Sequence, residues 1–494
     1  MKDVVASTLL GHSPTPSDVE QTKKLITQSE GNIARMESQI KDLECRCANE
    51  REIIASLRQA IAPIWRLPPE LLREIFQIDF AVASLGRWET PVKAILRLGQ
   101  VCTHWRWLVH TTPQLWAGLL VIDRITKPSD AYIAGIKNWV ERSAPLAIPV
   151  SIALNDLSRA DAAPLMDVLL GATHRWQTLH IFGGLLVEVT QIPAGALKEL
   201  EEVYIWTEEP HARVDTFVCA PRLRSVTLTA PHIELFPMPW TQLTQVNLNK
   251  VLPELCIRIL MQCMNLAYAE LHIDAGIRPD IPAFAENAAL AQLHTLFLYF
   301  SEPSSREQII PFLRCLELPA LKALELGISI RPPWPTEAVT QFLSRAPNIE
   351  EMAIVYSSLS SDDLQAVLRH VPSLNSLNIA NCWICIDDAF LRALRYSVHD
   401  PTPLAPRLVG LSFFNVGNEF QDASLEEMIQ SRWWSDAELR AMAVPPAVAR
   451  WETVSYCGGL DDDEVEDGQE FNDEFNEKLD AYRVQGLDVD VRKV

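Results

Sequence analysis

The chain has 494 residues, 48% of them hydrophobic and 22% charged, a composition typical of a globular protein and not of a disordered one. Its 64 acidic and 43 basic residues give a net charge of −21, which argues against a nucleic-acid partner, because binding of phosphate groups needs clustered Lys and Arg. No segment is apolar enough over the width of a bilayer and the N-terminus does not resemble a signal peptide, so we expect a soluble intracellular protein of two or three domains without membrane contact.

A long helix is predicted for residues 17–62, after a disordered N-terminus over residues 1–16. Ser17-Asp-Val-Glu20 resembles a capping box at the start of this helix. A heptad pattern follows, with Ile26, Ile33, Ile40, Cys47, Ile54 and Ile61 at one position and Ser29, Met36, Leu43, Glu50 and Leu57 at the other. Two interpretations remain open: a coiled coil that makes a homodimer, and a single amphipathic helix that lies on the following domains of its own chain. Two polar residues in the seam weaken the dimer.

Residues 63–121 are predicted to form a small all-α module. Pro68 and Pro69 suit the start of a helix, because the first helical N–H groups have no partner within the helix. One apolar stripe follows at Leu71, Leu72, Ile75 and Phe76, and a second consists of Leu98, Val101, Cys102, Trp105 and Leu108. A module of this size cannot bury all of these side chains by itself, so we expect some of them to face a partner.

The same segment resembles the F-box, whose pattern it matches at Leu67-Pro68, Leu71-Leu72, Ile75-Phe76, Val101-Cys102, Trp105, Leu108 and Leu115-Trp116. F-boxes bind the Skp adaptor of cullin–RING ubiquitin ligases, so the resemblance implies a substrate receptor that works in the cytoplasm and/or the nucleus. It implies adaptor-binding roles for Leu67, Pro68, Leu71, Leu72, Ile75, Phe76, Val101 and Trp105. The alternative is an ordinary buried helical hairpin.

The spacing within this module departs from the family. The gap from Ile75 to Val101 is longer than in compact F-boxes, and we expect the extra segment, near Asp79–Thr90, to loop out. A loop at this place is able to perturb the adaptor contact.

After a connecting helix over residues 122–145, the sequence of residues 146–456 is periodic. A strand is predicted at Leu146–Leu154, and a Leu-x-x-Leu-x-Leu pattern then recurs at separations that mostly fall within roughly 20–29 residues. The triplets are Trp176/Leu179/Ile181, Leu200/Val203/Ile205, Leu223/Val226/Leu228, Leu243/Val246/Leu248, Tyr268/Leu271/Ile273, Leu293/Leu296/Leu298, Leu321/Leu324/Leu326, Ile349/Met352/Ile354, Leu374/Leu377/Ile379 and Leu408/Leu411/Phe413. Several of the intervals between triplets carry helical periodicity.

This pattern resembles leucine-rich repeats over about residues 145–415. It predicts a solenoid with an inner parallel β-sheet and outer helices, in which each repeat needs its neighbour to bury its apolar face. The expected fold class is therefore α/β: a long N-terminal helix or coiled coil, a small all-α F-box, and a leucine-rich-repeat solenoid. The whole resembles the multi-repeat F-box receptors of mushroom-forming fungi.

Between the buried positions of each triplet, alternate side chains are predicted to face the concave side, because strand side chains switch sides at every residue. Aromatic residues gather there in two clusters, Phe182, Tyr204 and Trp206 in the first and Phe297 and Tyr299 in the second. Exposed aromatics suit an interface, so we predict that these residues contact a target protein. The alternative is that neighbouring loops or the C-terminal segment cover them.

The C-terminal part departs from the period. An acidic loop is predicted for residues 457–475, and a helix–strand pair over residues 476–494 is expected to cap the solenoid core. Further back, Cys382-Trp-Ile-Cys385 has redox or half-zinc spacing, but the sequence has no second pair at similar spacing. We therefore expect Cys382 to be a buried side chain at the turn after its strand.

The sequence contains no motif of a serine hydrolase, a zinc protease, a phosphate loop or a dinucleotide site, so we expect no catalytic, metal or cofactor-binding residues. Two functions remain. The first is the substrate-recognition subunit of a Skp–cullin–F-box ligase, whose repeats hold an unknown target protein. The second is an interaction scaffold without ligase function, dimerised through residues 17–62.

Overall fold

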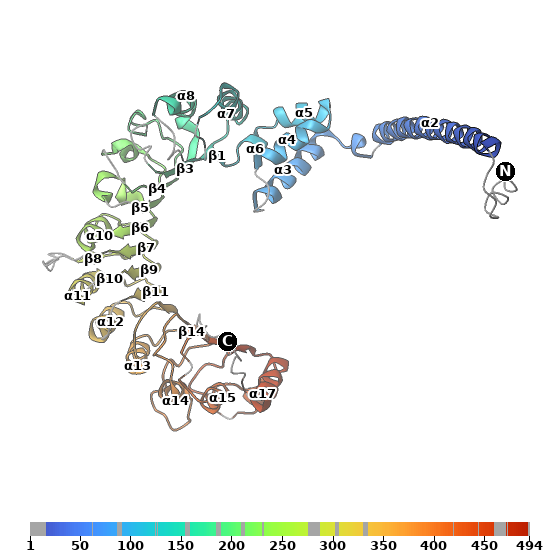
Figure 1. The fold of residues 1–494 in the computed structure, drawn as a ribbon. Coiled ribbons are helices and arrows are strands. Elements are labelled where there is room, and N and C mark those ends of the chain that lie inside the picture. Colours follow the sequence, from blue (N-terminus) through green and yellow to red (C-terminus); the bar gives the residue numbers. More distant parts are fainter. Residues whose placement is uncertain are drawn as a thin grey trace.

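The computed structural model describes residues 16–61, 63–85, 91–123, 125, 127–153, 159–183, 189–208, 213–229, 232–274, 287–301, 306–329, 334–417, 419–442, 444–458, 471 and 473–492. They form a long N-terminal helix, a small helical bundle and a curved solenoid (Figure 1). This mixed α/β architecture confirms the predicted fold class. The predicted disorder of residues 1–16 falls outside the described residues except at Pro16. The predicted acidic loop of residues 457–475 falls mostly outside them, and its described ends belong to strand and helix at 457–458 and 473–475.

The helical bundle follows the long helix α2 (Pro16–Ala60) and a short 3-10 turn, η1 (Pro63–Arg66). Its helices are α3 (Pro69–Leu85), α4 (Pro91–Val101), α5 (Thr103–His110) and α6 (Pro113–Trp116). Three of them begin with proline, which has no N–H to leave unpaired in the first turn. The second predicted stripe is divided between α4 and α5, because Cys102 is the N-cap of α5 and its Sγ accepts a hydrogen bond from the Trp105 N–H at 3.3 Å.

The prediction of a loop near Asp79–Thr90 is wrong for residues 79–85. Helix α3 continues to Leu85, so the extra segment lengthens this helix. Its sequence, Asp79-Phe-Ala-Val-Ala-Ser-Leu85, contains neither glycine nor proline and has two alanines, so nothing in it ends a helix. Residues 86–90 lie outside the described residues.

The described strands of the solenoid form one 14-stranded parallel sheet in which the strands follow one another in chain order. The strands are β1 (Leu120–Ile122), β2 (Ile148–Ala153), β3 (Trp176–Phe182), β4 (Glu202–Trp206), β5 (Ser225–Thr229), β6 (Gln245–Val251), β7 (Tyr268–Ile273), β9 (Thr295–Phe300), β11 (Ala323–Ile328), β12 (Glu351–Val355), β13 (Ser376–Ala380), β14 (Gly410–Val416), β15 (Thr453–Gly458) and β16 (Asp488–Arg492). A separate two-stranded pair consists of β8 (Ala288–Ala289) and β10 (Leu316–Glu317). The sheet begins with β1, one strand earlier than the sequence predicted. The prediction missed β1 because a strand of three residues is too short to show a period.

Helices cover the outer, convex side of the sheet (Figure 1). They are α7 (Asp130–Arg142), α8 (Arg159–Leu170), α10 (Pro253–Leu260), α11 (Arg306–Arg314), α12 (Thr336–Ser344), α13 (Ser361–Arg369), α14 (Asp388–Leu394), α15 (Asp422–Ser431), α16 (Asp436–Ala441) and α17 (Asp473–Val484). Short 3-10 turns lie at η2 (Thr173–Arg175), η3 (Asp215–Cys219), η4 (Ile233–Leu235) and η5 (Trp240–Gln242). The described helices thus leave the concave side of the sheet uncovered.

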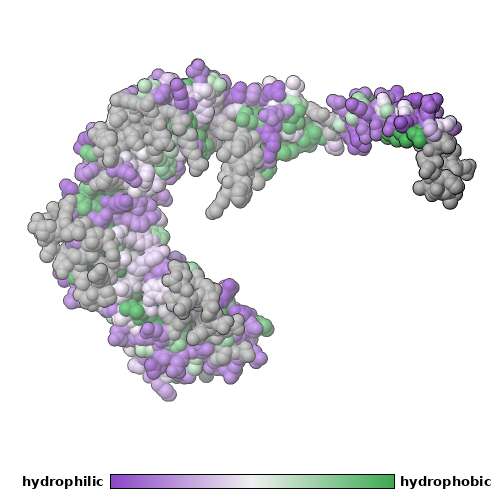
Figure 2. Space-filling model, viewed as in Figure 1, coloured by the Kyte–Doolittle hydropathy of each residue, from purple (hydrophilic) through white to green (hydrophobic). Residues whose placement is uncertain are grey.

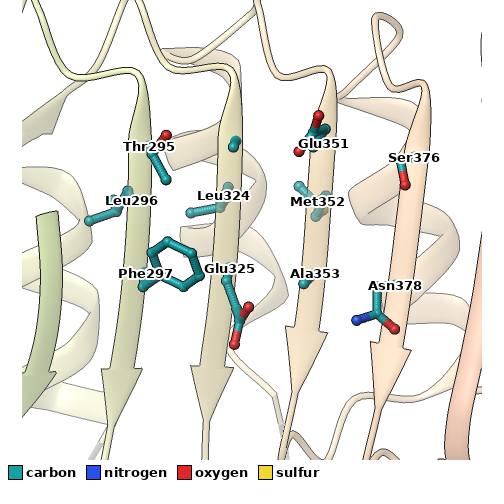
Figure 3. A pocket seen from close by; sticks show the side chains of 11 residues that line it. Thr295, Leu296, Phe297, Leu324, Glu325, Glu351, Met352, Ala353, Ser376 and Asn378 are labelled. Carbon is teal, nitrogen blue, oxygen red and sulfur yellow. The ribbon is translucent and has the colours of Figure 1, made fainter. Parts of the chain in front are cut away.

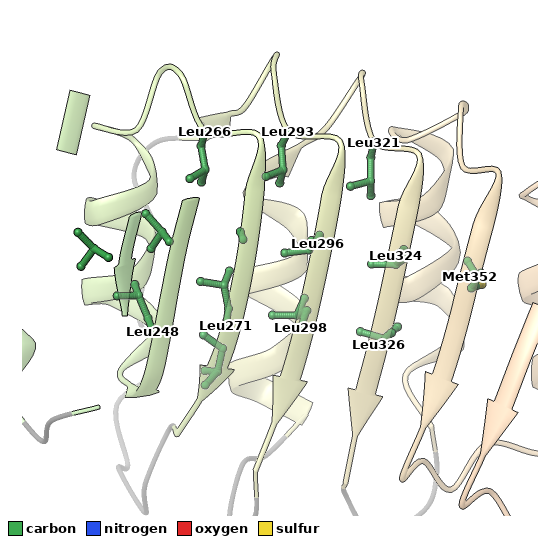
Figure 4. Packing of buried hydrophobic residues seen from close by; sticks show 14 of the residues in the cluster. Leu248, Leu266, Leu271, Leu293, Leu296, Leu298, Leu321, Leu324, Leu326 and Met352 are labelled. Carbon is green, nitrogen blue, oxygen red and sulfur yellow. The ribbon is translucent and has the colours of Figure 1, made fainter. Parts of the chain in front are cut away.

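The core consists of the triplet side chains stacked in columns between sheet and helices. Leu271 pairs in register with Leu298, which pairs with Leu326 (Figure 4). All three are at most 1% exposed, and burial of a leucine side chain stabilises the fold by roughly 1.5–3 kcal/mol. Because each column runs through many strands, the repeats share one continuous core.

The fifth triplet, predicted as Tyr268/Leu271/Ile273, is wrong by two residues. Val246 pairs with Ala269 and Leu248 with Leu271, so the equivalent triplet is Leu266, Ala269 and Leu271. The small Ala269 does not register as an apolar anchor in the pattern, although it is fully buried. Consequently Tyr268 lies in a concave position, half-buried, instead of in the core.

At its C-terminal end the solenoid continues beyond the last predicted triplet. Trp451, just before β15, and Val454 and Tyr456 on β15 are buried in the same spacing, and the helix–strand pair α17 and β16 adds the terminal strand. Cys382 is fully buried just after β13, as expected, with its Sγ 3.4 Å from the Ala380 carbonyl oxygen.

Candidate functional site

Helix α3 has two apolar faces, and among the described residues one is buried while the other is exposed. Leu72 and Phe76 are 1% exposed, and the Phe76 ring lies 4.8 Å from that of Trp105 between centroids. On the other face Leu71, Ile75 and Ile78 are 45%, 44% and 64% exposed. Spacings of four and three residues place these three side chains in one stripe along the helix. The bundle therefore presents an apolar surface that no described residue covers, and Figure 2 shows hydrophobic residues at the surface of the bundle.

The predicted adaptor-binding residues divide into three groups. Pro68, Leu71, Ile75 and Val101 are exposed, Leu67 and Trp105 are half-buried, and Leu72 and Phe76 lie in the core of the bundle. The sequence could not make this division, because all eight positions fit the same apolar pattern. The sequence analysis also missed Ile78. This residue lies seven positions, or about two helical turns, beyond Leu71, and that spacing could have identified it.

The bundle is fastened to the solenoid by a tryptophan pair. The Trp116 indole N–H donates a 2.8 Å hydrogen bond to the Val109 carbonyl, and its ring meets Trp139 of α7 edge-on at 5.1 Å. The Arg142 guanidinium lies 4.7 Å from the centre of the Trp116 ring. Both tryptophans are buried, so the apolar surface of α3 is held in a fixed relation to the first solenoid helix.

On the concave face, the first predicted aromatic cluster is brought together. Phe182 and Trp206 are register partners on neighbouring strands, and the Phe182 ring lies 5.1 Å from that of Tyr204. All three side chains are half-buried, so part of each remains accessible. Their contact with a target protein stays a prediction.

The second cluster is part of a wider polar network. The Tyr299 hydroxyl donates to Glu325 Oε1 at 2.5 Å, and the ring stacks on His272 at 4.5 Å. Burial together with the hydrogen bond to Glu325 raises the pKa of Tyr299, so the phenol keeps its proton. Phe297 lies 5.5 Å from Tyr268, one of the residues that the wrong fifth triplet had placed in the core.

Glu270 is the centre of this network and was missed by the sequence analysis for the same reason. Its carboxylate accepts a 2.7 Å hydrogen bond from the Asn247 amide and lies 3.4 Å from the Tyr268 hydroxyl. The His272 Nε2 lies 3.1 Å from the other carboxylate oxygen. The concave face thus offers carboxylates and aromatic rings together.

The exposure of helix α2 rules out one of the two interpretations of its heptad pattern. Its apolar residues, including Ile33, Ile40 and Leu57, are exposed, and no described residue of the helix belongs to the hydrophobic core. The helix extends away from the bundle (Figure 1). The interpretation in which it lies on the following domains of its own chain is therefore wrong, and its apolar stripe has no partner within the described chain.

Among the described residues, no group of three or more His, Cys, Asp or Glu side chains is arranged to hold a metal ion. The described helices include none with the length and apolarity that a membrane crossing requires.

Comparison with known proteins finds one family model and a number of distantly similar solved structures, of which two are described here. Residues 64–121 match the model of the F-box-like family. No curated protein matches the chain. The yeast Rad7–Elc1 complex is similar at 15% identity and a TM-score of 0.34, over 76% of this chain and 95% of that chain. Internalin C2 of Listeria monocytogenes is similar at 12% identity and a TM-score of 0.22, over 52% of this chain and 78% of that chain.

Proposed function

Because residues 64–121 are an F-box-like domain, we propose that the chain is the substrate-recognition subunit of a Skp–cullin–F-box ubiquitin ligase. The observation that carries this proposal is the outer face of α3. An isolated small domain does not gain from exposing an apolar stripe, and such a stripe is typical of a contact surface. We assign the adaptor contact to Pro68, Leu71, Ile75 and Val101, joined by Ile78.

In this function the chain itself forms no covalent bond. The solenoid would hold a target protein on its concave face and raise the local concentration of the target's lysines near a ubiquitin-carrying enzyme. The buried Trp116–Trp139 contact supports this role, since a rigid junction keeps the distance between adaptor and target constant. Such complexes work in the cytoplasm and the nucleus, where we place this chain.

Co-expression with a Skp-family adaptor and a cullin N-terminal fragment tests the proposal. We expect the three proteins to elute together from a size-exclusion column in equal amounts. If the folded chain elutes apart from the adaptor, the ligase role is contradicted and the scaffold function remains.

We further propose that α2 forms a two-stranded coiled coil with a second copy of the chain. Isoleucine dominates one seam position while leucine and methionine occupy much of the other, a combination that favours two strands. Since the stripe is exposed along the helix, a second α2 would bury it. This dimer is compatible with both the receptor and the scaffold.

Changing the seam should separate the two copies. We expect light scattering to give twice the 55.6 kDa chain mass for the wild type, and a single chain mass for Ile33→Asp/Ile40→Asp, because two carboxylates would be buried in the seam. The matched control, Ser38→Asp/Cys45→Asp, adds the same charges on the opposite helix face and should stay dimeric. A monomeric wild type would contradict the proposed dimer and would leave the proposed receptor role unaffected.

A further inference from the structure

We propose that the concave face from β9 to β13 binds an extended basic segment of the target protein, with one Arg or Lys side chain seated in a hollow of the sheet. This inference rests on the proposed function, since it names the chemistry of the partner that the receptor would recruit. It is carried by the charges of the sheet face and by the shape and lining of the hollow.

Apart from the exposed Lys250 at the bulge of β6, the concave positions of β2 to β15 contain carboxylates and no lysine or arginine. Their acidic residues are Glu202, Glu270, Glu325 and Glu351. Among the concave positions that are paired in register, a basic residue first occurs on the terminal strand β16. This residue, Arg492, is paired with Asp490 at 2.8 Å. Lys322, just before β11, is likewise paired, with Glu350 at 3.2 Å. A surface with this charge attracts a cationic segment and repels nucleic-acid phosphates.

The hollow has a volume of about 160 Å³ and crosses four strands (Figure 3). The hollow exists because Ala323 and Ala353 occupy concave positions where the neighbouring strand carries the larger Glu351 and Glu325. This volume is about that of a cavity that holds one benzene molecule, so it suits a single side chain. The hollow is therefore a pocket for one residue of a longer bound segment.

The lining of the hollow matches a cation. The ring of Phe297 lies on one side of the hollow (Figure 3). The carboxylates of Glu325 and Glu351 lie at the edge of the hollow. A guanidinium or ammonium over an aromatic face gains cation–π energy, and the carboxylates accept its hydrogen bonds. Because Glu325 is fixed by the 2.5 Å hydrogen bond from Tyr299, its orientation is set before the ligand arrives.

The opposite side of the hollow adds polar groups without adding positive charge. Ser376 and Asn378 line it from β13, and the Asn378 amide can accept a further hydrogen bond. The planar guanidinium can stack on Phe297 and bind a carboxylate through two N–H groups at once, whereas an ammonium is a point charge. We therefore expect arginine to be preferred over lysine.

A library of short peptides, each with one fixed residue among randomised ones, tests the inference on the immobilised full-length chain. The wild type should enrich arginine, and lysine more weakly. Glu325→Gln/Glu351→Gln should reduce the arginine enrichment about tenfold, the change that a loss of 1.4 kcal/mol produces. Ala353→Phe, which fills the hollow without changing charge, should abolish it. Glu202→Gln, on the same face but outside the hollow, should leave it unchanged.

Three results would overturn the inference: enrichment of acidic or apolar residues, enrichment of none, or arginine enrichment that survives in both hollow variants. Adaptor co-elution is measured separately and does not involve these residues. A failure in the peptide experiment with an intact adaptor complex would therefore refute the basic segment alone, whereas loss of the adaptor complex would refute the proposed function.

Discussion

A chain that carries Leu71→Asp and Ile75→Asp should lose adaptor binding while it keeps its fold. Both side chains are about half exposed in the free chain, at 45% and 44%, so the new carboxylates stay hydrated there. Against an apolar adaptor surface they would be buried without partners, which costs several kcal/mol each. Since 1.4 kcal/mol is tenfold in affinity, we expect at least a ~1000-fold rise in Kd, measured by fluorescence anisotropy with labelled adaptor.

Two controls separate binding from folding. Val218→Asp replaces an apolar residue of similar exposure, 46%, on the solenoid turn η3, and should leave both affinity and melting temperature unchanged. Leu72→Ala, on the buried face of α3, should instead lower the free energy of unfolding by about 2–5 kcal/mol. If the double aspartate variant bound the adaptor with wild-type affinity, the outer face of α3 would not be the adaptor contact.

The largest effect on stability is expected for Trp116→Ala. This change removes a buried ring that packs edge-on against Trp139, and it leaves the Val109 carbonyl with only the longer, 3.4 Å hydrogen bond from the Thr112 N–H. The Arg142 guanidinium also loses the ring over which it lies. Truncation of a buried tryptophan costs about 3–5 kcal/mol, so we expect a loss of this size in the free energy of unfolding, measured by denaturant titration.

Because Trp116 joins the bundle to the solenoid, its loss should also open the junction to proteases. Limited proteolysis of Trp116→Ala should give early cleavage between α6 and α7, which the wild type resists. The control is Trp383→Ala, whose indole is 46% exposed, and its effect on unfolding should stay within about 0.5 kcal/mol. Equal stability losses in the two variants would show that the tryptophan pair does not hold the junction.

The repeats could be predicted from the sequence because a buried triplet leaves a strong trace. Leu296, Leu324 and Leu377 fill equivalent core positions, and only large apolar residues fill them well, so the period survives between them. The prediction failed at Ala269, where the same position is filled by a small residue and the pattern moved by two. That error hid Glu270, the centre of the concave network.

The F-box resemblance is confirmed by the family match to residues 64–121, but the sequence could not assign its two apolar faces. Leu71 and Leu72 are adjacent and chemically identical, and only the helix geometry turns one outward and the other into the core. The length of α3 was misjudged because a family comparison flags extra residues without saying whether they continue a helix. The hollow around Ala353 was equally invisible, since small residues carry no period.

The most direct test of the adaptor contact is a calorimetric titration of the purified full-length chain with a purified Skp adaptor at several temperatures. We predict saturable binding of one adaptor per chain with a negative heat-capacity change, because the exposed stripe of α3 becomes buried apolar surface. A folded chain that gives no heat of binding at any temperature, or binding without a heat-capacity change, would contradict the assignment of this surface.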